Sequence, residues 1–237
     1  MGELIVQLIP VALGVVLSPL AIIALVAVLL SHLPRVNGVA YLLGWIVGLC
    51  GLLALFLWIF DALDISAVFE PPLWVALLQL LIGLLLVGAA VWVYRRGAAR
   101  IRRMAAASTP HEVARAASLP GWLQGVERFH PGRSFLLGVG LFVINPVDAS
   151  CALIAALDIS LAAVTPTQAT WAAVGFAVVG ILPIAIPVTV VIVRGQRAQP
   201  MLDRVRTWIA GNTHVLNAGL LLVIGALQLE KAVTALL

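Results

Sequence analysis

Charged residues are scarce in this sequence. Only 10% of its 237 residues are Asp, Glu, Lys or Arg, whereas 63% are hydrophobic. An ordinary soluble domain has about 25% charged and about 45–50% apolar residues. A soluble fold of this length could not bury so much apolar surface, so lipid is expected to be the solvent for much of the chain.

Cysteine is almost absent as well. Cys50 and Cys151 lie far apart in separate apolar runs and form no CxxC motif. This spacing excludes a disulfide framework and a cysteine-based zinc site. We interpret both as small buried hydrophobic residues, and we expect neither a metal nor a cofactor.

Sequence patterns of common enzymes are also missing. The phosphate-binding pattern GxxxxGK[ST] does not occur, so ATP hydrolysis by this chain is not expected. His111-Glu112 begins like the zinc motif HExxH, but Arg115 stands where the second histidine is needed. No Ser/His pair or carboxylate pair lies within the apolar runs, so we expect that the protein is not an enzyme.

Long apolar runs are what the sequence has in abundance. Runs of about 18 residues or more are candidates for membrane-spanning helices, and their lack of alternation favours helices over strands. The sequence therefore predicts an all-α integral membrane protein with six transmembrane helices, at about residues 4–30, 38–60, 73–94, 134–156, 167–193 and 208–229.

Arginine is unevenly distributed among the segments between these helices. The segments after helices 1, 3 and 5 carry the arginines. The segments after helices 2 and 4 carry acidic residues and no Arg or Lys, and Lys231, near the C-terminus, is the one basic residue on their side of the membrane. Basic segments normally stay in the cytoplasm. We therefore expect a multi-pass plasma-membrane protein with both termini outside. The arginines that give the net charge of +4 would then contact the anionic inner leaflet, so we do not expect nucleic acid as a partner.

Matching motifs occur in the same order in two halves of the chain. We expect a first three-helix repeat at 1–94, an Arg-rich cytoplasmic loop at 95–133 and a second three-helix repeat at 134–237. An odd number of spans per half predicts inverted repeats, which are common in secondary transporters. The matched motifs are Leu17-Ser18-Pro19 with Ile144-Asn145-Pro146, Gly44-Trp45 with Gly175-Phe176, and residues 80–83 with 222–225.

The loop at 95–133 is the longest polar segment. Apolar residues recur at helical spacing between Pro120 and Pro131, which favours a short helix at the membrane interface. A solvated linker between the two halves is the alternative interpretation.

A proline near the middle of helices 1 and 4 predicts that both are interrupted. Pro19 and Pro146 lack an N–H donor and crowd the carbonyl four residues earlier. Such carbonyls are costly in lipid unless they are satisfied, and the polar side chains of Ser18 and Asn145 are suited to that task. Matching interruptions indicate a binding site at mid-membrane, with simple kinks as the alternative.

Asp148 lies two residues after Pro146, inside predicted helix 4. A carboxylate at this depth is expensive and should face a cavity or a partner. We interpret it as a candidate proton carrier or as the counter-charge of a cationic substrate, with capping of the second half-helix as the structural alternative. The candidate substrate or coupling site is Ser18, Pro19, Asn145, Pro146 and Asp148, with no catalytic residue.

These features resemble the LysE superfamily of membrane exporters, and most closely its GAP family, described as addressing glycolipids or peptidoglycolipids to the mycobacterial surface. Residues 13–20 and Asn145-Pro146 carry the resemblance best, and it implies export across the plasma membrane. A related family shuttles electrons through a cysteine directly after each proline. Leu20 and Val147 stand there in this sequence, so disulfide exchange is not expected.

The sequence thus favours a secondary transporter or exporter of a lipid-linked, glycolipid or other amphipathic substrate, since the spans offer few polar contacts. An exporter of a small solute (an amino acid or a cation) is one alternative. A non-transporting accessory protein that docks on a lipid-export machine through residues 95–133 is another. Membrane lipids and the substrate are the expected partners, and a homodimer or a complex with that machinery is compatible with the pattern.

Overall fold

The computed structural model describes residues 1–29, 31–63, 73–106, 130–195 and 199–236, and these residues contain helices and no strand. This confirms the predicted all-α class. The helices are α1 (Gly2–Val16), α2 (Pro19–Leu29), α3 (Pro34–Ala62), α4 (Leu73–Ala106), α6 (Pro131–Ile144), α7 (Pro146–Leu161), α8 (Pro166–Arg194) and α9 (Gln199–Leu236).

Four of these helices are long and apolar enough to cross a membrane on their own: α3, α8, the Leu73–Arg96 part of α4 and the Val215–Leu236 part of α9. Two bent pairs qualify when each is taken as one broken span, α1 with α2 at 45° and α6 with α7 at 65°. The described chain therefore has four candidate spans, or six with the bent pairs. The breaks fall directly before Pro19 and Pro146, which confirms the predicted interruptions.

Proline begins five of the helices, namely α2, α3, α6, α7 and α8. Its fixed φ suits the first helical position, where an N–H group would have no helical partner. At the start of α8, Thr165 and Gln168 form a reciprocal capping box, which satisfies two further backbone donors. Local sequence signals therefore account for where these helices begin.

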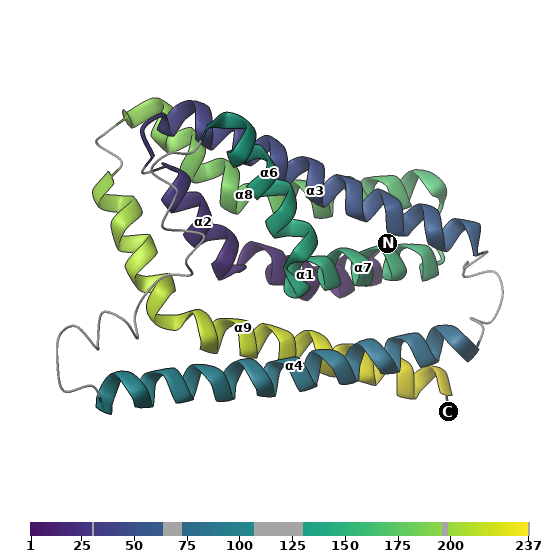
Figure 1. Cartoon of the computed structure of the whole chain (residues 1–237). Coiled ribbons are helices and arrows are strands. Elements are labelled where there is room, and N and C mark those ends of the chain that lie inside the picture. Colours follow the sequence, from purple (N-terminus) through teal and green to yellow (C-terminus); the bar gives the residue numbers. More distant parts are fainter. Residues whose placement is uncertain (30, 64–72, 107–129, 196–198, 237) are drawn as a thin grey trace.

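The helices form a bundle in which α4 and α9 lie side by side along one flank (Figure 1). On the other side, α3 packs most extensively on α6 and also contacts α7 and α8, while α1 contacts α7 and α8. Contacts from α9 to α2 and α1 join the two parts. Both termini lie at the same end of the bundle (Figure 1), where Met1 and Ala235 line a common cavity. This agrees with an even number of spans, and the orientation in the membrane stays a prediction.

Glycine permits the closest helix contact, between α3 and α6. A Cβ atom on Gly44 would clash with the carbonyl oxygen of Phe135, and one on Gly138 would clash with that of Tyr41. Because both obstacles are backbone atoms, the two helices can approach this closely only with glycine at these positions.

A second glycine contact joins α4 and α9. A Cβ atom on either Gly83 or Gly225 would lie 3.1 Å from the carbonyl oxygen of the other. These are the last residues of the motifs at 80–83 and 222–225 that the sequence comparison of the two halves had paired. The pairing does not extend to every motif, because Gly44 is buried in a helix contact whereas Gly175 has open space around its Cα.

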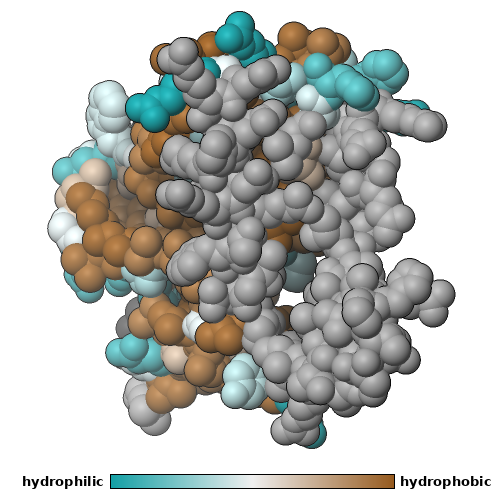
Figure 2. Space-filling view, turned by 90° about the vertical axis from the view of Figure 1, so that its left-hand side faces the viewer, coloured by the Kyte–Doolittle hydropathy of each residue, from teal (hydrophilic) through white to brown (hydrophobic). Residues whose placement is uncertain are grey.

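Large apolar side chains are exposed on the outer faces of the helices, as the hydrophobic surface patches in Figure 2 show. A soluble monomer rarely exposes such extensive apolar surface. Exposed aromatic residues gather near the ends of the candidate spans, with Trp58, Trp74 and Trp171 toward the end that holds the termini and Trp92 and Tyr94 toward the other. Aromatic belts of this kind mark the two membrane–water interfaces.

Helix α4 is longer than its apolar run. It continues to Ala106, so residues 95–106, which were predicted to belong to the cytoplasmic loop, are helical. Ala and Arg are good helix formers, so the helix outlasts the change from apolar to basic residues. The predicted interfacial helix before Pro131 falls mainly within residues 107–129, which lie outside the described residues.

The two cysteines differ in their surroundings. Cys151 is buried, as expected, whereas Cys50 is exposed on α3, so the prediction that both are buried is wrong for Cys50. The reason is that lipid can solvate an apolar residue that water would force inside.

Candidate functional site

The two helix breaks meet inside the bundle. Ser18 lies between α1 and α2, while Asn145 lies between α6 and α7 and Asp148 in the first turn of α7. The Ser18 hydroxyl donates to Oδ2 of Asp148 at 2.9 Å, and the Asn145 amide donates to the same oxygen at 2.6 Å. The Asn145 amide nitrogen is also 3.2 Å from the Ser18 hydroxyl oxygen. The three polar side chains singled out in the sequence therefore form one cluster, called here the break cluster.

Asn145 holds α7 and Asp148 in place at once. Its Oδ1 accepts from the backbone N–H of Val147 at 3.3 Å, which makes it the N-cap of α7. Pro146 occupies the first helical position, and its side chain is exposed, so it shapes the break without joining the cluster. Asn145 therefore caps α7, whereas Asp148 accepts hydrogen bonds from the side chains of Ser18 and Asn145. Capping of α7 by Asp148, the structural alternative drawn from the sequence, is not what the structure shows.

On the α1 side, the backbone satisfies the carbonyl that Pro19 was expected to free. The Ser18 N–H donates to the Val15 carbonyl at 3.2 Å, and the Leu17 N–H donates to the Leu13 carbonyl at 2.9 Å. The prediction that the Ser18 side chain satisfies this carbonyl is therefore wrong. The Ser18 hydroxyl donates to Asp148 instead. Pro19 begins α2 and sets the position of the break.

Two of the three residues of the break cluster are fully buried, and Asn145 is partly exposed. Ser18 and Asp148 are both 0% exposed, and Oδ1 of Asp148 has no hydrogen-bond partner within the described part of the chain. Among the residues whose side chains the structure describes, the only ion pair is formed elsewhere, by Asp158 and Lys231. A buried carboxylate without a cation costs several kcal/mol in effective desolvation. The break cluster is therefore a candidate functional site.

Helix α3 contributes two aromatic donors that hold the neighbouring helices. The Tyr41 hydroxyl donates to the Ala21 carbonyl of α2, and the Trp45 indole donates to the Gly180 carbonyl of α8, both at 3.0 Å. Trp45 also meets Phe142 edge-on, with ring centroids 5.0 Å apart. Sequence reasoning missed these residues, although a Trp and a Tyr in a glycine-rich span are a usable signal.

Trp45→Phe is expected to lower the thermal midpoint of the purified protein. The substitution keeps an aromatic ring against Phe142 but removes the donor to Gly180, at a cost of about 1 kcal/mol. Trp58→Phe, at a 67% exposed position, is the matched control and should leave the midpoint nearly unchanged. Equal shifts in the two variants would contradict a role for this hydrogen bond.

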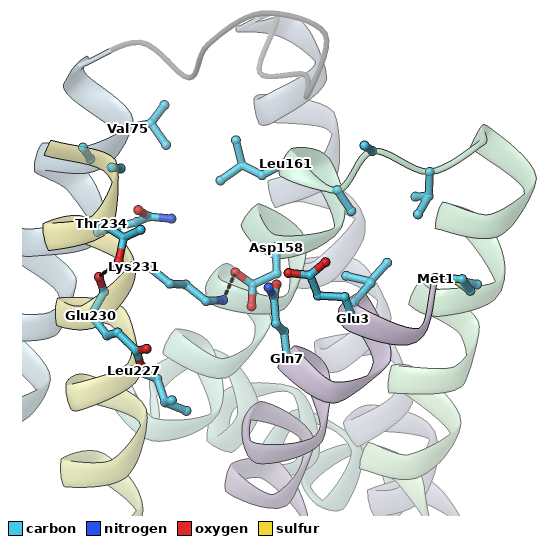
Figure 3. A pocket seen from close by; sticks show the side chains of 17 residues that line it. Met1, Glu3, Gln7, Val75, Asp158, Leu161, Leu227, Glu230, Lys231 and Thr234 are labelled. Atoms are coloured by element: carbon cyan, nitrogen blue, oxygen red, sulfur yellow. Dashed lines mark hydrogen bonds and ion pairs between the residues drawn. The ribbon is translucent and has the colours of Figure 1, made fainter. Parts of the chain in front are cut away.

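A second polar region lies at the end of the bundle that holds the termini. A cavity of about 670 Å³ is lined there by α1, α4, α7, α9 and residues 161–164 (Figure 3). Asp158 and Lys231, which the sequence placed near span ends without pairing them, form an ion pair there at 2.7 Å. The described residues contain no group of three or more His, Cys, Asp or Glu placed to hold a metal ion.

Comparison with known proteins adds one family assignment. Residues 8–234 match the family described as Sap, sulfolipid-1-addressing protein (SfLAP), and this range contains both helix breaks and the whole break cluster. Neither the curated proteins nor the solved structures give a match. The family match and the resemblance seen in the sequence agree that this is a lipid-addressing membrane protein. Membership of the LysE superfamily or its GAP family stays a prediction. The chain belongs to the sulfolipid-1-addressing protein family.

Proposed function

We propose that this protein is a secondary transporter that exports a lipid-linked, glycolipid or other amphipathic molecule across the plasma membrane, and that it is not an enzyme. The family description supports a role in lipid addressing. The observation that carries the transport part is the meeting of two broken helices at a buried carboxylate. Paired broken helices commonly form the substrate and ion sites of transporters.

The hydrogen bonds of Asp148 suggest how the two halves are coupled. Asn145 and Asp148 belong to the same helix start and move together, whereas Ser18 reaches Asp148 from the other half of the chain. The Ser18–Asp148 bond is therefore one of the polar contacts between the halves that a rocking motion would break, together with those from Asn145 to Ser18 and from Trp45 to Gly180. In alternating access one repeat rocks against the other around a fixed site.

Asp148 is also suited to bind a coupling proton. Both recorded hydrogen bonds go to Oδ2, and Oδ1 has no partner among the described residues. A proton on Oδ1 would neutralise the carboxylate without displacing either donor. Since movement of a charged group through lipid is costly, we propose that the protonated form is the one in which the halves move.

Reconstitution into liposomes tests the proposal. A fluorescent glycolipid is placed in one leaflet, and a membrane-impermeant quencher reports its transfer to the other with and without a pH gradient. We expect transfer that depends on the protein and responds to the gradient. Transfer of amino acids or cations in place of the lipid would contradict the substrate class. Absence of any flux, together with co-purification of a large export complex, would favour an accessory role.

Ser18→Ala is expected to reduce transport by about tenfold while the protein still folds. The variant removes a hydrogen bond to a charged group, a type of bond worth about 1.5–3 kcal/mol. The matched control is Ser134→Ala, because the Ser134 hydroxyl is also buried but has no partner in the described part of the chain. Liposome transfer rates at equal protein content measure the effect, and equal rates for both variants would contradict the assigned role.

A further inference from the structure

The cavity at the end of the bundle has a mixed polar lining drawn from four helices (Figure 3). Only part of it is acidic, and its polar groups include both acceptors and donors. The side chains that matter here are Glu3 and Gln7 of α1, Gln79 of α4, Asp158 of α7, and Glu230 and Lys231 of α9.

Asp158 is the most deeply buried charged group of this cavity. Its side chain is 2% exposed, while that of Lys231 is 24% exposed, and the Lys231 ammonium bonds Oδ1 of Asp158 at 2.7 Å. Figure 3 shows the lysine reaching across from α9 toward Asp158. The second oxygen, Oδ2, is buried without a hydrogen-bond partner in the described part of the chain. An unsatisfied buried acceptor is costly, so a bound molecule that donates to Oδ2 would relieve that cost.

The charges of the lining restrict what such a molecule can be. Among the side chains that line the cavity, three carry a carboxylate and one carries an ammonium, so their net negative charge disfavours an anionic group. A sulfate or phosphate diester also has no O–H group to offer to Oδ2. A cationic headgroup would have to sit beside the Lys231 ammonium, which already occupies Asp158. A hydroxyl group avoids both conflicts, because it donates and accepts and carries no charge.

The surroundings of the cavity indicate a ligand with an apolar part. On α4 and α9, apolar side chains close in sequence to the lining residues are exposed, with Leu73 at 70% and Val233 at 49%. In a bilayer this surface contacts acyl chains, while polar groups at a span end meet the headgroup region. The cavity therefore lies where the headgroup of a membrane lipid can enter from the side.

We propose that this cavity is a separate binding site for the uncharged polyhydroxyl headgroup of an amphipathic lipid, with one hydroxyl donating to Oδ2 of Asp158 and another accepting from Lys231. It is distinct from the break cluster, because the ten positions from Asp148 to Asp158 span about 15 Å of helix. The lipid nature of the ligand rests on the proposed function, but binding can be measured without transport.

The first experiment measures binding of defined lipids to the full chain in phosphatidylcholine nanodiscs. The probe is a fluorescent dialkyl lipid with a neutral disaccharide headgroup. Comparison lipids with the same tails carry a single hydroxyl, a sulfated disaccharide or a trimethylammonium group. We expect the neutral disaccharide lipid to bind at least tenfold more tightly than each of the others. Equal binding of the single-hydroxyl lipid, or tighter binding of the sulfated or cationic lipid, would overturn the proposal.

The second experiment tests the residues. The double variant Asp158→Asn with Lys231→Gln replaces the ion pair by two neutral amides and is expected to weaken disaccharide-lipid binding at least tenfold. Gln7→Leu, at a partly exposed lining position, should weaken it several-fold even if the double variant does not fold. Asp61→Asn, an exposed position outside the cavity, is the matched control. Unchanged affinity in a folded lining variant would refute the assignment.

The two proposals fail in different ways. Binding that depends on Asp158 and Lys231 without any lipid transfer in liposomes would refute the transporter and leave the headgroup site standing. Lipid transfer that continues unchanged in the double variant, with no loss of disaccharide-lipid binding, would refute the headgroup site alone.

Discussion

Asp148→Asn is expected to abolish the response of transport to a pH gradient, so that gradient-driven lipid transfer in liposomes falls to the rate measured without a gradient. Asn keeps an oxygen that can accept from Ser18 and Asn145, which are the donors at 2.9 Å and 2.6 Å in the native protein. It cannot bind and release a proton, because a carboxamide does not titrate in this range. The variant therefore separates the shape of the break cluster from its charge.

The control for this experiment is Asp61→Asn, the same chemical change at an exposed position at the end of α3. Its transfer rate should equal that of the native protein at both pH values. The thermal midpoint of Asp148→Asn should not fall, because the substitution removes a buried charge without a cationic partner. Native-like transport with an intact pH response in Asp148→Asn would rule out proton coupling through this residue.

Gly138→Val is expected to produce the largest loss of folded protein. Any Cβ at this position meets the Tyr41 carbonyl and is also 2.8 Å from the Trp45 backbone nitrogen, so α3 and α6 must separate. Overpacking typically costs about 1–3 kcal/mol, and an obstacle made of backbone cannot move aside as a side chain can. The fraction of monodisperse protein after extraction and its thermal midpoint measure the effect.

Gly140→Val provides the matched control on the same helix, because a Cβ at Gly140 has no neighbour within 4 Å. We expect this variant to be recovered in native-like yield. Similar losses for both variants would mean that valine disturbs α6 itself and that the close contact with α3 is unimportant.

The two predictions concern neighbouring parts of the molecule, the glycine contact between α3 and α6 and the break cluster at the start of α7. Helix α6 packs on α3 through Gly44 and Gly138 and ends directly before Asn145, which caps α7 and donates to Asp148. The glycine contact therefore sets the position from which α7 departs at 65°. A variant that loosens α3 from α6 should also disturb the break cluster, so Gly138→Val is a test of folding and not of transport.

Much of the fold could be predicted from the sequence because the signals are local. Apolar runs of the length of a bilayer marked the spans, and proline marked the breaks before Pro19 and Pro146. The same reasoning predicted the end of the third span, which lies at Arg96, but not the continuation of α4 to Ala106, because hydropathy reports where lipid ends and not where a helix ends. It also misjudged Cys50, since lipid removes the usual link between an apolar side chain and burial.

The candidate site was only partly predictable. Ser18, Asn145 and Asp148 stood out because polar residues in a span are expensive, and the order of motifs suggested that the two breaks are related. Their mutual hydrogen bonds could not be read from the chain, and neither could the use of Tyr41 and Trp45 as donors to other helices. The ion pair of Asp158 and Lys231 was missed because each residue alone looked like an ordinary charge at a span end.

The sequence by itself determined that this protein is a helical membrane protein whose first and fourth spans are broken, because hydropathy and the missing N–H of proline act within a few residues. Only the tertiary structure decided that Ser18 meets Asp148 across 130 residues and that Lys231 meets Asp158 across 73. Such contacts depend on how closely helices pack, and that distance is set by glycine contacts between segments far apart in the chain. The polar residues could be identified in the sequence, but only helix packing brings them together in the break cluster and in the cavity beside Asp158 and Lys231.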